Sequence, residues 1–214
     1  MVREIRYRRR YEDKRIWLEW QKYDQYTSEL MHCSEEAQMR LVNKVRIQVF
    51  SDMIGRLGKE LSVLDVGCGN GFVGEQIWKM GNSVTCVDLP KVAVLAHKRR
   101  FLLVVGADAE CLPFASHSFD VVLASEIIEH LWNPDKFLDE AFRVLKDNGH
   151  LIIATPEGEE GLRWDAHLRY FTIKSLRQLV GAKFAICEVR IIEPKGSARE
   201  HTTPMFISLL RKLK

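Results

Sequence analysis

Short apolar runs alternate with amphipathic segments along much of the chain, which is typical of a parallel sheet covered by helices. Each run ends in or just before a glycine, an acid or another small polar residue, and the runs predict strands at Leu61–Val66, Ser83–Val87, Leu102–Val105, Val121–Ala124 and His150–Ala154. Helices are predicted at Phe72–Met80, Pro134–Leu145 and Ser175–Val180. The pattern predicts an α/β fold with helices on both faces of the sheet.

The last part of the chain departs from this alternation. Phe184–Ile192 and Met205–Leu210 are apolar enough to predict two further strands. The loop that joins them, residues 193–203, is short enough for an antiparallel hairpin and carries no crossover helix.

Residues 1–58 are predicted to be a helical extension or lid in front of a domain at residues 59–214, because they contain no glycine before Gly55. Within Gln38–Leu57, apolar residues recur every three or four positions, which predicts one buried helical stripe. Its expected members are Met39, Val42, Val45, Val49, Met53 and Leu57.

Composition fits one compact domain with a short extension, since 46% of the 214 residues are hydrophobic and 29% are charged. No apolar stretch reaches the roughly 20 residues needed to cross a bilayer, and the first residues lack the apolar core of a secretory signal. We therefore expect a cytoplasmic protein.

The net charge of +3 is mild but unevenly distributed. Residues 3–15 hold seven basic and three acidic side chains. Such an arm could bind RNA or another polyanion, or it could be a solvated helix face with internal ion pairs.

The first predicted strand runs directly into the turn Gly67-Cys68-Gly69-Asn70-Gly71, and a helix follows. Glycines at such a strand end allow a sharp turn and a close approach of the backbone to a ligand, here expected at Gly67, Cys68 and Gly69. The spacing G-x-G-x-G differs from the G-x-G-x-x-G of dinucleotide-binding proteins. Asp65 precedes the turn, and its carboxylate would repel a pyrophosphate but suit a ligand that carries an ammonium or a sulfonium.

Two more acids follow at the next strand ends. Asp88 lies 21 residues after Gly67, where a carboxylate can accept both ribose hydroxyls. Asp108 follows the third strand, where it could accept an adenine amino group while the Ala109 amide faces a ring nitrogen. Leu89 and Ala109 could hold the base between them. Three acids at three successive strand ends indicate a site for an adenosine-containing ligand.

With these motifs, the sequence resembles the class I S-adenosylmethionine (SAM)-dependent methyltransferases, including the branch with the ubiquinone-pathway O-methyltransferases. The resemblance is carried by VLDVGCGNG, VTCVDLP, the segment from Gly106 to Pro134, and EAFRVLKDNGHLIIATPE. It implies a Rossmann-like seven-stranded sheet with an antiparallel last strand, SAM as cofactor and S-adenosylhomocysteine (SAH) as product. The cofactor-binding residues expected on these grounds are Asp65, Gly67, Cys68, Gly69, Asp88, Leu89, Asp108, Ala109 and Ser125.

Candidate catalytic residues follow the fourth strand. Glu126, Glu129 and His130 are spaced to lie close together on a helical turn, and His167 is a fourth candidate further along the chain. These four could hold a divalent ion such as Mg²⁺ or Zn²⁺. Alternatively His130 or His167 acts as a base without metal, with Glu126 orienting the cofactor, or the two histidines are structural.

E-x-x-E-H also resembles the metal site of two methyltransferase groups, the ubiquinone-pathway O-methyltransferases and the small-RNA 3′-terminal 2′-O-methyltransferases. The expected function is methyl transfer to a small-molecule acceptor, with oxygen ahead of nitrogen or carbon. The alternatives are an RNA methyltransferase that uses the basic arm, and a SAM-binding protein without catalysis.

Overall fold

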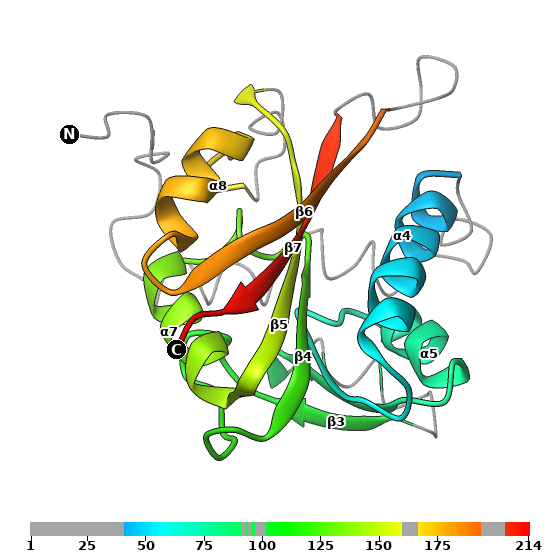
Figure 1. The fold of residues 1–214 in the computed structure, drawn as a ribbon. Coiled ribbons are helices and arrows are strands. Elements are labelled where there is room, and N and C mark those ends of the chain that lie inside the picture. Colours follow the sequence, from blue (N-terminus) through cyan, green and yellow to red (C-terminus); the bar gives the residue numbers. More distant parts are fainter. Residues whose placement is uncertain (1–40, 91–92, 94–95, 97–101, 160–166, 194–203) are drawn as a thin grey trace.

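The computed structural model describes residues 41–90, 93, 96, 102–159, 167–193 and 204–214 (Figure 1). Its helices are α4 (Leu41–Leu57), α5 (Phe72–Lys79), α7 (Pro134–Val144) and α8 (Ile173–Val180). Its strands are β1 (Ser62–Val66), β2 (Ser83–Asp88), β3 (Leu103–Gly106), β4 (Phe119–Ser125), β5 (Leu145–Pro156), β6 (Phe184–Ile192) and β7 (Met205–Lys212). The basic arm at residues 3–15 lies outside the described residues, and the domain boundary at residue 58 stays a prediction.

All seven strands form one sheet in the order β3-β2-β1-β4-β5-β7-β6. The first five pair in parallel, whereas β7 is antiparallel to both β5 and β6. The predicted α/β fold and C-terminal hairpin are therefore confirmed. The chain moves outward from β1 to β3 and then returns to place β4 on the other side of β1, so the crevice at which such folds bind ligands lies between the carboxyl ends of β1 and β4.

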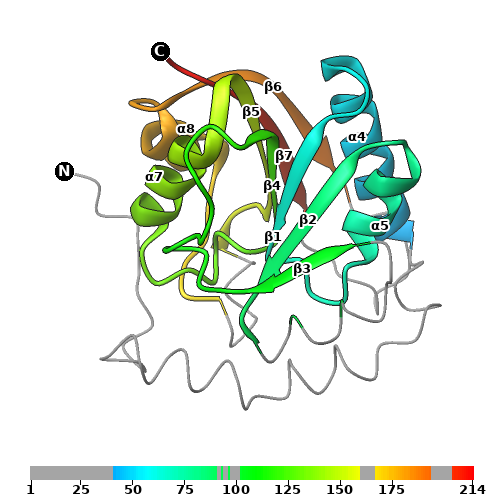
Figure 2. The same cartoon turned by 90° about the horizontal axis from the view of Figure 1, so that it is seen from below.

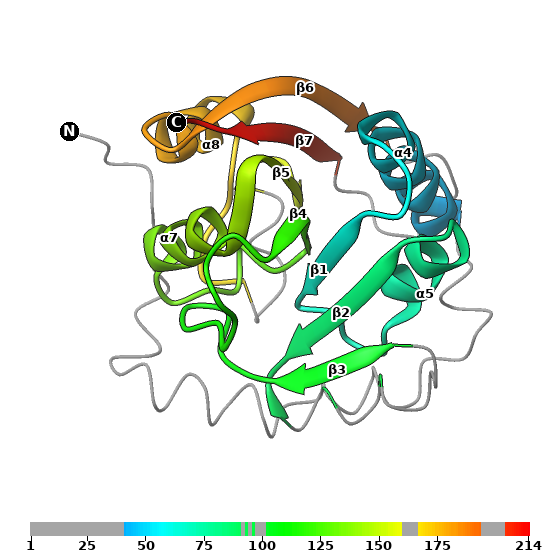
Figure 3. The same ribbon diagram turned by 60° about the horizontal axis from the view of Figure 1, so that its bottom comes forward.

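Two helical layers enclose the sheet, with α4 and α5 on one face and α7 and α8 on the other (Figures 2 and 3). Successive strand residues alternate between the two layers, as the pleat requires. Leu64, Val122 and Leu151 belong to the core under α7 and α8, and their neighbours Val63 and Val121 belong to the core under α4 and α5. Burial on both faces explains why these strands are almost continuously apolar.

The strand β5 begins at Leu145, five residues earlier than expected. β4 pairs Phe119 with Leu145 and then Val121 with His150, so the intervening residues bulge from the ladder. Asn148 takes the left-handed conformation that the bulge needs, with φ of 62°. Pairing before the bulge accounts for the extended strand.

The buried face of α4 differs from the predicted stripe. It consists of Val49, Phe50, Met53 and Ile54, whereas Val45 is 39% exposed. A helix that packs on a sheet buries a face two residues wide, which a single i, i+4 row misses, and here that face begins only at Val49. The expected stripe residues Met39 and Val42 have no described side chains.

No helix in the described part of the chain is long and apolar enough to cross a bilayer. A cytoplasmic location stays a prediction from the sequence.

We predict that Phe50→Ala destabilises the protein by about 3–5 kcal/mol, because it leaves a cavity under α4. Val45→Ala, on the same helix, should change stability by less than about 1 kcal/mol because its side chain is partly solvated. Urea unfolding of both variants measures the difference. Equal losses would contradict the observed orientation of the helix.

Candidate functional site

The glycine turn after β1 depends on backbone conformations that favour glycine. Gly67, Gly69 and Gly71 have φ values of 73°, 54° and 74°. The Gly67 and Cys68 N–H groups both donate to the Val87 carbonyl, at 2.8 and 3.1 Å, which fixes the turn to the end of β2. A Cβ atom on Gly67 would lie 2.7 Å from Cδ1 of Ile127, so the turn also packs tightly against the segment after β4.

Asp88, at the end of β2, holds the next part of the turn. Its Oδ2 accepts from the Gly69 N–H at 2.8 Å, and its Oδ1 accepts from the Leu89 N–H at 2.7 Å. Burial raises the pKa of Asp88 to about 6 in spite of these two amides. Each carboxylate oxygen can accept a second hydrogen bond, which is what the predicted pair of ribose contacts requires.

The third strand end lies beside the second, since the Ala107 N–H donates to the Asp88 carbonyl at 2.8 Å. Oδ1 of Asp108 accepts from the Glu110 N–H at 2.9 Å, so this side chain also shapes its own turn. Ala109 is buried and Leu89 is half-buried. The structure thus brings the predicted adenosine-binding residues to adjacent strand ends, while their contacts with a ligand stay predictions.

Asp65 lies beneath the turn. It is 1% exposed, and its Oδ2 is 3.1 Å from the position of a Cβ on Gly74, in the first turn of α5. Burial, and then the charge of Asp88, raises the pKa of Asp65 to about 7. Oδ2 has no hydrogen-bond partner among the described residues. An ionised carboxylate here would be stabilised by the positive N-terminal end of α5, and it would attract a cationic ligand bound above the turn.

Arg46 is a site residue that the sequence reasoning missed. It projects from α4 and forms an ion pair with Glu126, just after β4. Its side chain is 12% exposed and that of Glu126 is 42% exposed. Nothing in the helical pattern of α4 distinguishes this arginine from its charged neighbours, because only the packing of α4 against the sheet brings it to the crevice. Ser125, the preceding residue, has a buried Oγ without a hydrogen-bond partner among the described residues.

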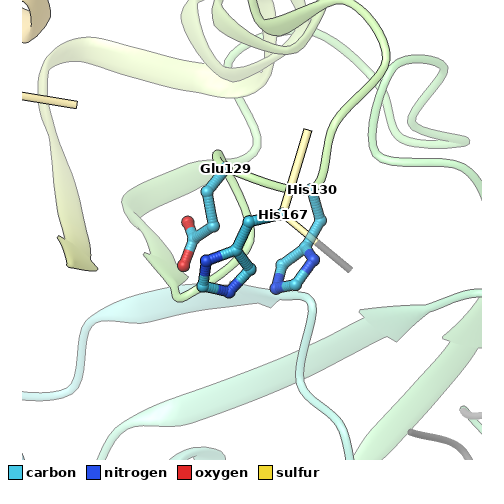
Figure 4. A group of neighbouring side chains, drawn as sticks. All are labelled: Glu129, His130 and His167. Carbon is cyan, nitrogen blue, oxygen red and sulfur yellow. The ribbon is translucent and has the colours of Figure 1, made fainter. Parts of the chain in front are cut away.

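Three of the four candidate metal ligands lie together. One ligand atom each of Glu129, His130 and His167 is within 4.8 Å of the others, and Figure 4 shows the three side chains gathered side by side. The two imidazole rings meet edge to face, with centroids 4.6 Å apart. Glu126 is not in this cluster. The residue after β4 is bent, with φ of 52° at Glu126, so it does not start the helical turn that the spacing predicted.

The segment around the cluster is fixed from beneath by Arg169, which is 1% exposed. Its guanidinium donates to the carbonyls of Leu131 and, at 3.1 Å, Trp132. The Leu168 N–H donates to the Glu129 carbonyl at 3.0 Å. These bonds join two segments that lie almost 40 residues apart in sequence, and they place His167 against His130.

Glu129 is the buried member of the cluster, at 1% exposure. Thr155 Oγ1 donates to its Oε2 at 3.0 Å, whereas Oε1 has no hydrogen-bond partner among the described residues. Burial, and then the charge of Glu126, raises the pKa of Glu129 to about 8. An unsatisfied buried carboxylate oxygen beside two imidazoles fits a cation, and this donor set suits a transition-metal ion such as Zn²⁺ while leaving coordination positions open.

We predict that Gly67→Ala is more damaging than Gly81→Ala. Both glycines have positive φ, so both variants carry backbone strain of about 1–2 kcal/mol. Only at Gly67 does the new methyl group also collide with Ile127, whereas nothing lies within 4 Å of a Cβ at Gly81. Overpacking should add about 1–3 kcal/mol to the loss. Thermal unfolding compares the two, and a Gly81 variant that is equally destabilised would contradict the tight contact.

Ionisation of the buried Asp65 should lower the free energy of unfolding of the wild type as pH rises, and we predict that Asp65→Asn removes this loss. The folded pKa of about 7 lies above the ordinary value, so the penalty for ionising the buried group grows from about pH 4 to 7 and is complete above it. The variant removes a penalty of at most about 4 kcal/mol. Urea unfolding from pH 5 to 8 measures it, with Asp135→Asn on an exposed helix end as the control. Parallel pH profiles for wild type and Asp65→Asn would contradict the prediction.

Comparison with known sequences finds relatives for the part of the chain that carries the glycine turn. Residues 64–153 match a family described as a methyltransferase domain. A probable SAM-dependent methyltransferase of Mycobacterium tuberculosis is 36% identical over 96 residues, which cover 44% of this chain and 35% of the relative. A ubiquinone biosynthesis O-methyltransferase of Pseudomonas fluorescens is 30% identical over 130 residues, which cover 57% of this chain and 55% of the relative. The chain therefore spans about a third to a half of these relatives.

Solved structures share the fold at low sequence identity. A Burkholderia thailandensis 1,6-didemethyltoxoflavin-N1-methyltransferase, solved with 1,6-didemethyltoxoflavin and SAH, has a TM-score of 0.75 at 18% identity. The match covers 95% of this chain and 92% of that chain. An N-methyltransferase of Bradyrhizobium japonicum, solved with SAH, has a TM-score of 0.74 at 16% identity and covers 89% of this chain and 100% of its own. The glycine turn, the strand order and the matched segment at residues 64–153 are thus similar to those of the class I SAM-dependent methyltransferases.

Proposed function

We propose that the protein transfers a methyl group from SAM to a small-molecule acceptor, with a hydroxyl oxygen as the preferred methyl acceptor atom. The observation that carries the proposal is the left-handed glycine turn together with Asp88 and Asp108 at adjacent strand ends. This arrangement offers one backbone surface and two carboxylates to an adenosine, at the edge where open α/β sheets bind ligands.

In this proposal the cofactor lies across the carboxyl ends of β1, β2 and β3. Asp88 accepts the ribose hydroxyls, Asp108 accepts the adenine amino group, and Leu89 and Ala109 flank the base. The backbone of Gly67, Cys68 and Gly69 lies against the methionine part. Arg46 is the natural partner for its carboxylate, and Asp65 and Ser125 favour its ammonium, because their buried oxygens have no hydrogen-bond partner among the described residues.

The reaction is an in-line displacement. A lone pair of the acceptor oxygen attacks the methyl carbon, the carbon–sulfur bond breaks, and its electrons remain on sulfur as a neutral thioether. The oxygen loses its proton to a base, for which His130 and His167 are the candidates at the end of β4. The protein otherwise contributes positioning and exclusion of water, because the sulfonium is already a good leaving group.

A divalent ion at Glu129, His130 and His167 would lower the pKa of an acceptor hydroxyl that it binds. The three side chains fit such an ion, as the unsatisfied Oε1 of Glu129 indicates. With a metal, both histidines would be ligands, and the acidified acceptor proton would pass to solvent. Without one, a histidine takes the proton. In both cases an oxygen acceptor benefits from the cluster more than an amine does, which supports the preference for oxygen.

The ubiquinone biosynthesis O-methyltransferase relatives also support an oxygen acceptor, whereas the two structural neighbours described above are N-methyltransferases. Transfer to RNA is the alternative acceptor class. It depends on the basic arm at residues 3–15, which lies outside the described residues.

We predict that Asp88→Ala weakens SAH binding by about 10- to 100-fold, the loss expected when a charged group that accepts hydrogen bonds is removed. Isothermal titration with SAH measures it. Asp135→Ala, on an exposed helix end, is the control and should bind as wild type does. Unchanged affinity in the Asp88 variant would place the cofactor elsewhere.

Turnover tests the activity itself. SAH release should appear with small phenols or alcohols in preference to amines, and only weakly with RNA. We expect His130→Ala and His167→Ala to lower turnover by about 100-fold or more while SAH affinity changes little. Loss of activity in chelator, restored by Zn²⁺ or Mg²⁺, supports the metal. Release with RNA alone would support the alternative acceptor, and no release with any acceptor would support a SAM-binding protein without catalysis.

A further inference from the structure

Three acidic side chains and one arginine lie near the carboxyl ends of β1 and β4, namely Asp65, Glu126, Glu129 and Arg46. The positive charge of Arg46 opposes the effect of burial on the pKa of Asp65 and of Glu129, and the negative charge of Glu126 adds to that effect at Glu129. Arg46 is therefore within electrostatic range of Asp65 and Glu129, besides its ion pair with Glu126.

The ion pair between Arg46 and Glu126 links a residue that we propose contacts the cofactor to the segment that carries the cluster of Glu129, His130 and His167. Arg46 comes from α4 and is nearly buried, whereas the carboxylate of Glu126 is partly open to solvent. Glu126 lies three residues before Glu129, and its N–H donates to the Ala154 carbonyl at 2.8 Å. Its backbone has a φ of 52°, and it lies just beyond the end of β4.

The cluster of Glu129, His130 and His167 has a single carboxylate. A second carboxylate, that of Glu126, lies three residues earlier in the chain, but Arg46 neutralises its charge as long as the ion pair persists. A cofactor carboxylate offers Arg46 a competing partner of the same chemistry, and guanidinium groups bind carboxylates strongly. If Arg46 turns to the cofactor, Glu126 loses its cation and becomes available to another one.

We propose that Arg46 exchanges Glu126 for the cofactor's carboxylate, and that the released Glu126 then joins Glu129, His130 and His167 as a metal ligand. The proposal rests on the proposed function, because it requires SAM binding at the glycine turn. Arg46, the nearly buried cation, keeps a carboxylate partner in both states, which avoids the cost of an unpaired buried ion. The consequence is positive coupling, in which cofactor raises metal affinity and metal raises cofactor affinity by the same factor.

The test is a titration of the full chain with Co²⁺, followed by its visible absorption, which reports the number and kind of ligands. SAH at saturation should increase Co²⁺ affinity by about tenfold and change the spectrum toward higher coordination. Methylthioadenosine is the matched ligand control. It has the adenosine and the thioether but lacks the amino-acid carboxylate, so it should bind without raising Co²⁺ affinity.

A double-mutant cycle separates ligand exchange from simple repulsion between Arg46 and the metal. Arg46→Gln should raise Co²⁺ affinity in the absence of SAH to the level that wild type reaches with SAH. Glu126→Gln should hold Co²⁺ weakly with or without SAH. In the Glu126→Gln background, removal of Arg46 should have little effect. Arg56→Gln is the matched control, because Arg56 lies in the last turn of the same helix and pairs with Glu188 on β6; it should behave as wild type.

Three results would overturn the proposal: equal Co²⁺ affinity with and without bound SAH, an increase with methylthioadenosine as large as with SAH, or an equal effect of Arg46→Gln in both backgrounds. Failure of the proposed function is distinguishable, because SAH would then not bind wild type at all. Folding of each variant is checked by its thermal unfolding midpoint.

Discussion

The contact between Gly67 and Ile127 is the constraint on which the rest of the site depends. It joins the turn, at which we propose that the cofactor binds, to the segment that carries Glu126, Glu129 and His130, and it leaves no room for a side chain. The hydrogen bonds from Gly67 and Cys68 to Val87 then align the end of β2, and Ala107 aligns the end of β3 with it. The candidate cofactor-binding and catalytic residues thus keep fixed relative positions, because the ends of three strands and one loop are joined by these contacts.

Several acidic side chains are buried around these strand ends. Asp65, Asp88 and Glu129 all have pKa values raised mainly by burial. Such groups cost stability in the free protein, and cationic or hydrogen-bonding ligands repay that cost on binding. The oxygens without a hydrogen-bond partner among the described residues, on Asp65 beneath the glycine turn and on Glu129 in the histidine cluster, are where we expect a ligand to gain most. Arg46 lies within electrostatic range of both.

Within the described residues, local patterns predicted most of the strands and helices well. The apolar runs that became β1, β2 and β4 are buried on both faces, so their hydrophobicity is continuous and easy to recognise. Prediction was poorer where a tertiary contact decides the outcome. β5 begins early because it pairs with β4 before the bulge at Asn148, and the buried face of α4 depends on how the helix rests on the sheet.

The sequence by itself determined the resemblance to the class I methyltransferases, the order of the elements and the residues at each strand end, because glycine spacing and acids at strand ends are local features. Only the tertiary structure decided which candidates come together. His167 lies against His130 because the buried Arg169 holds their two segments together. Glu126 lies outside the predicted cluster and pairs with Arg46, which is 80 residues earlier in the sequence. These contacts join segments that are far apart in the chain, and sequence spacing carries no information about such distances.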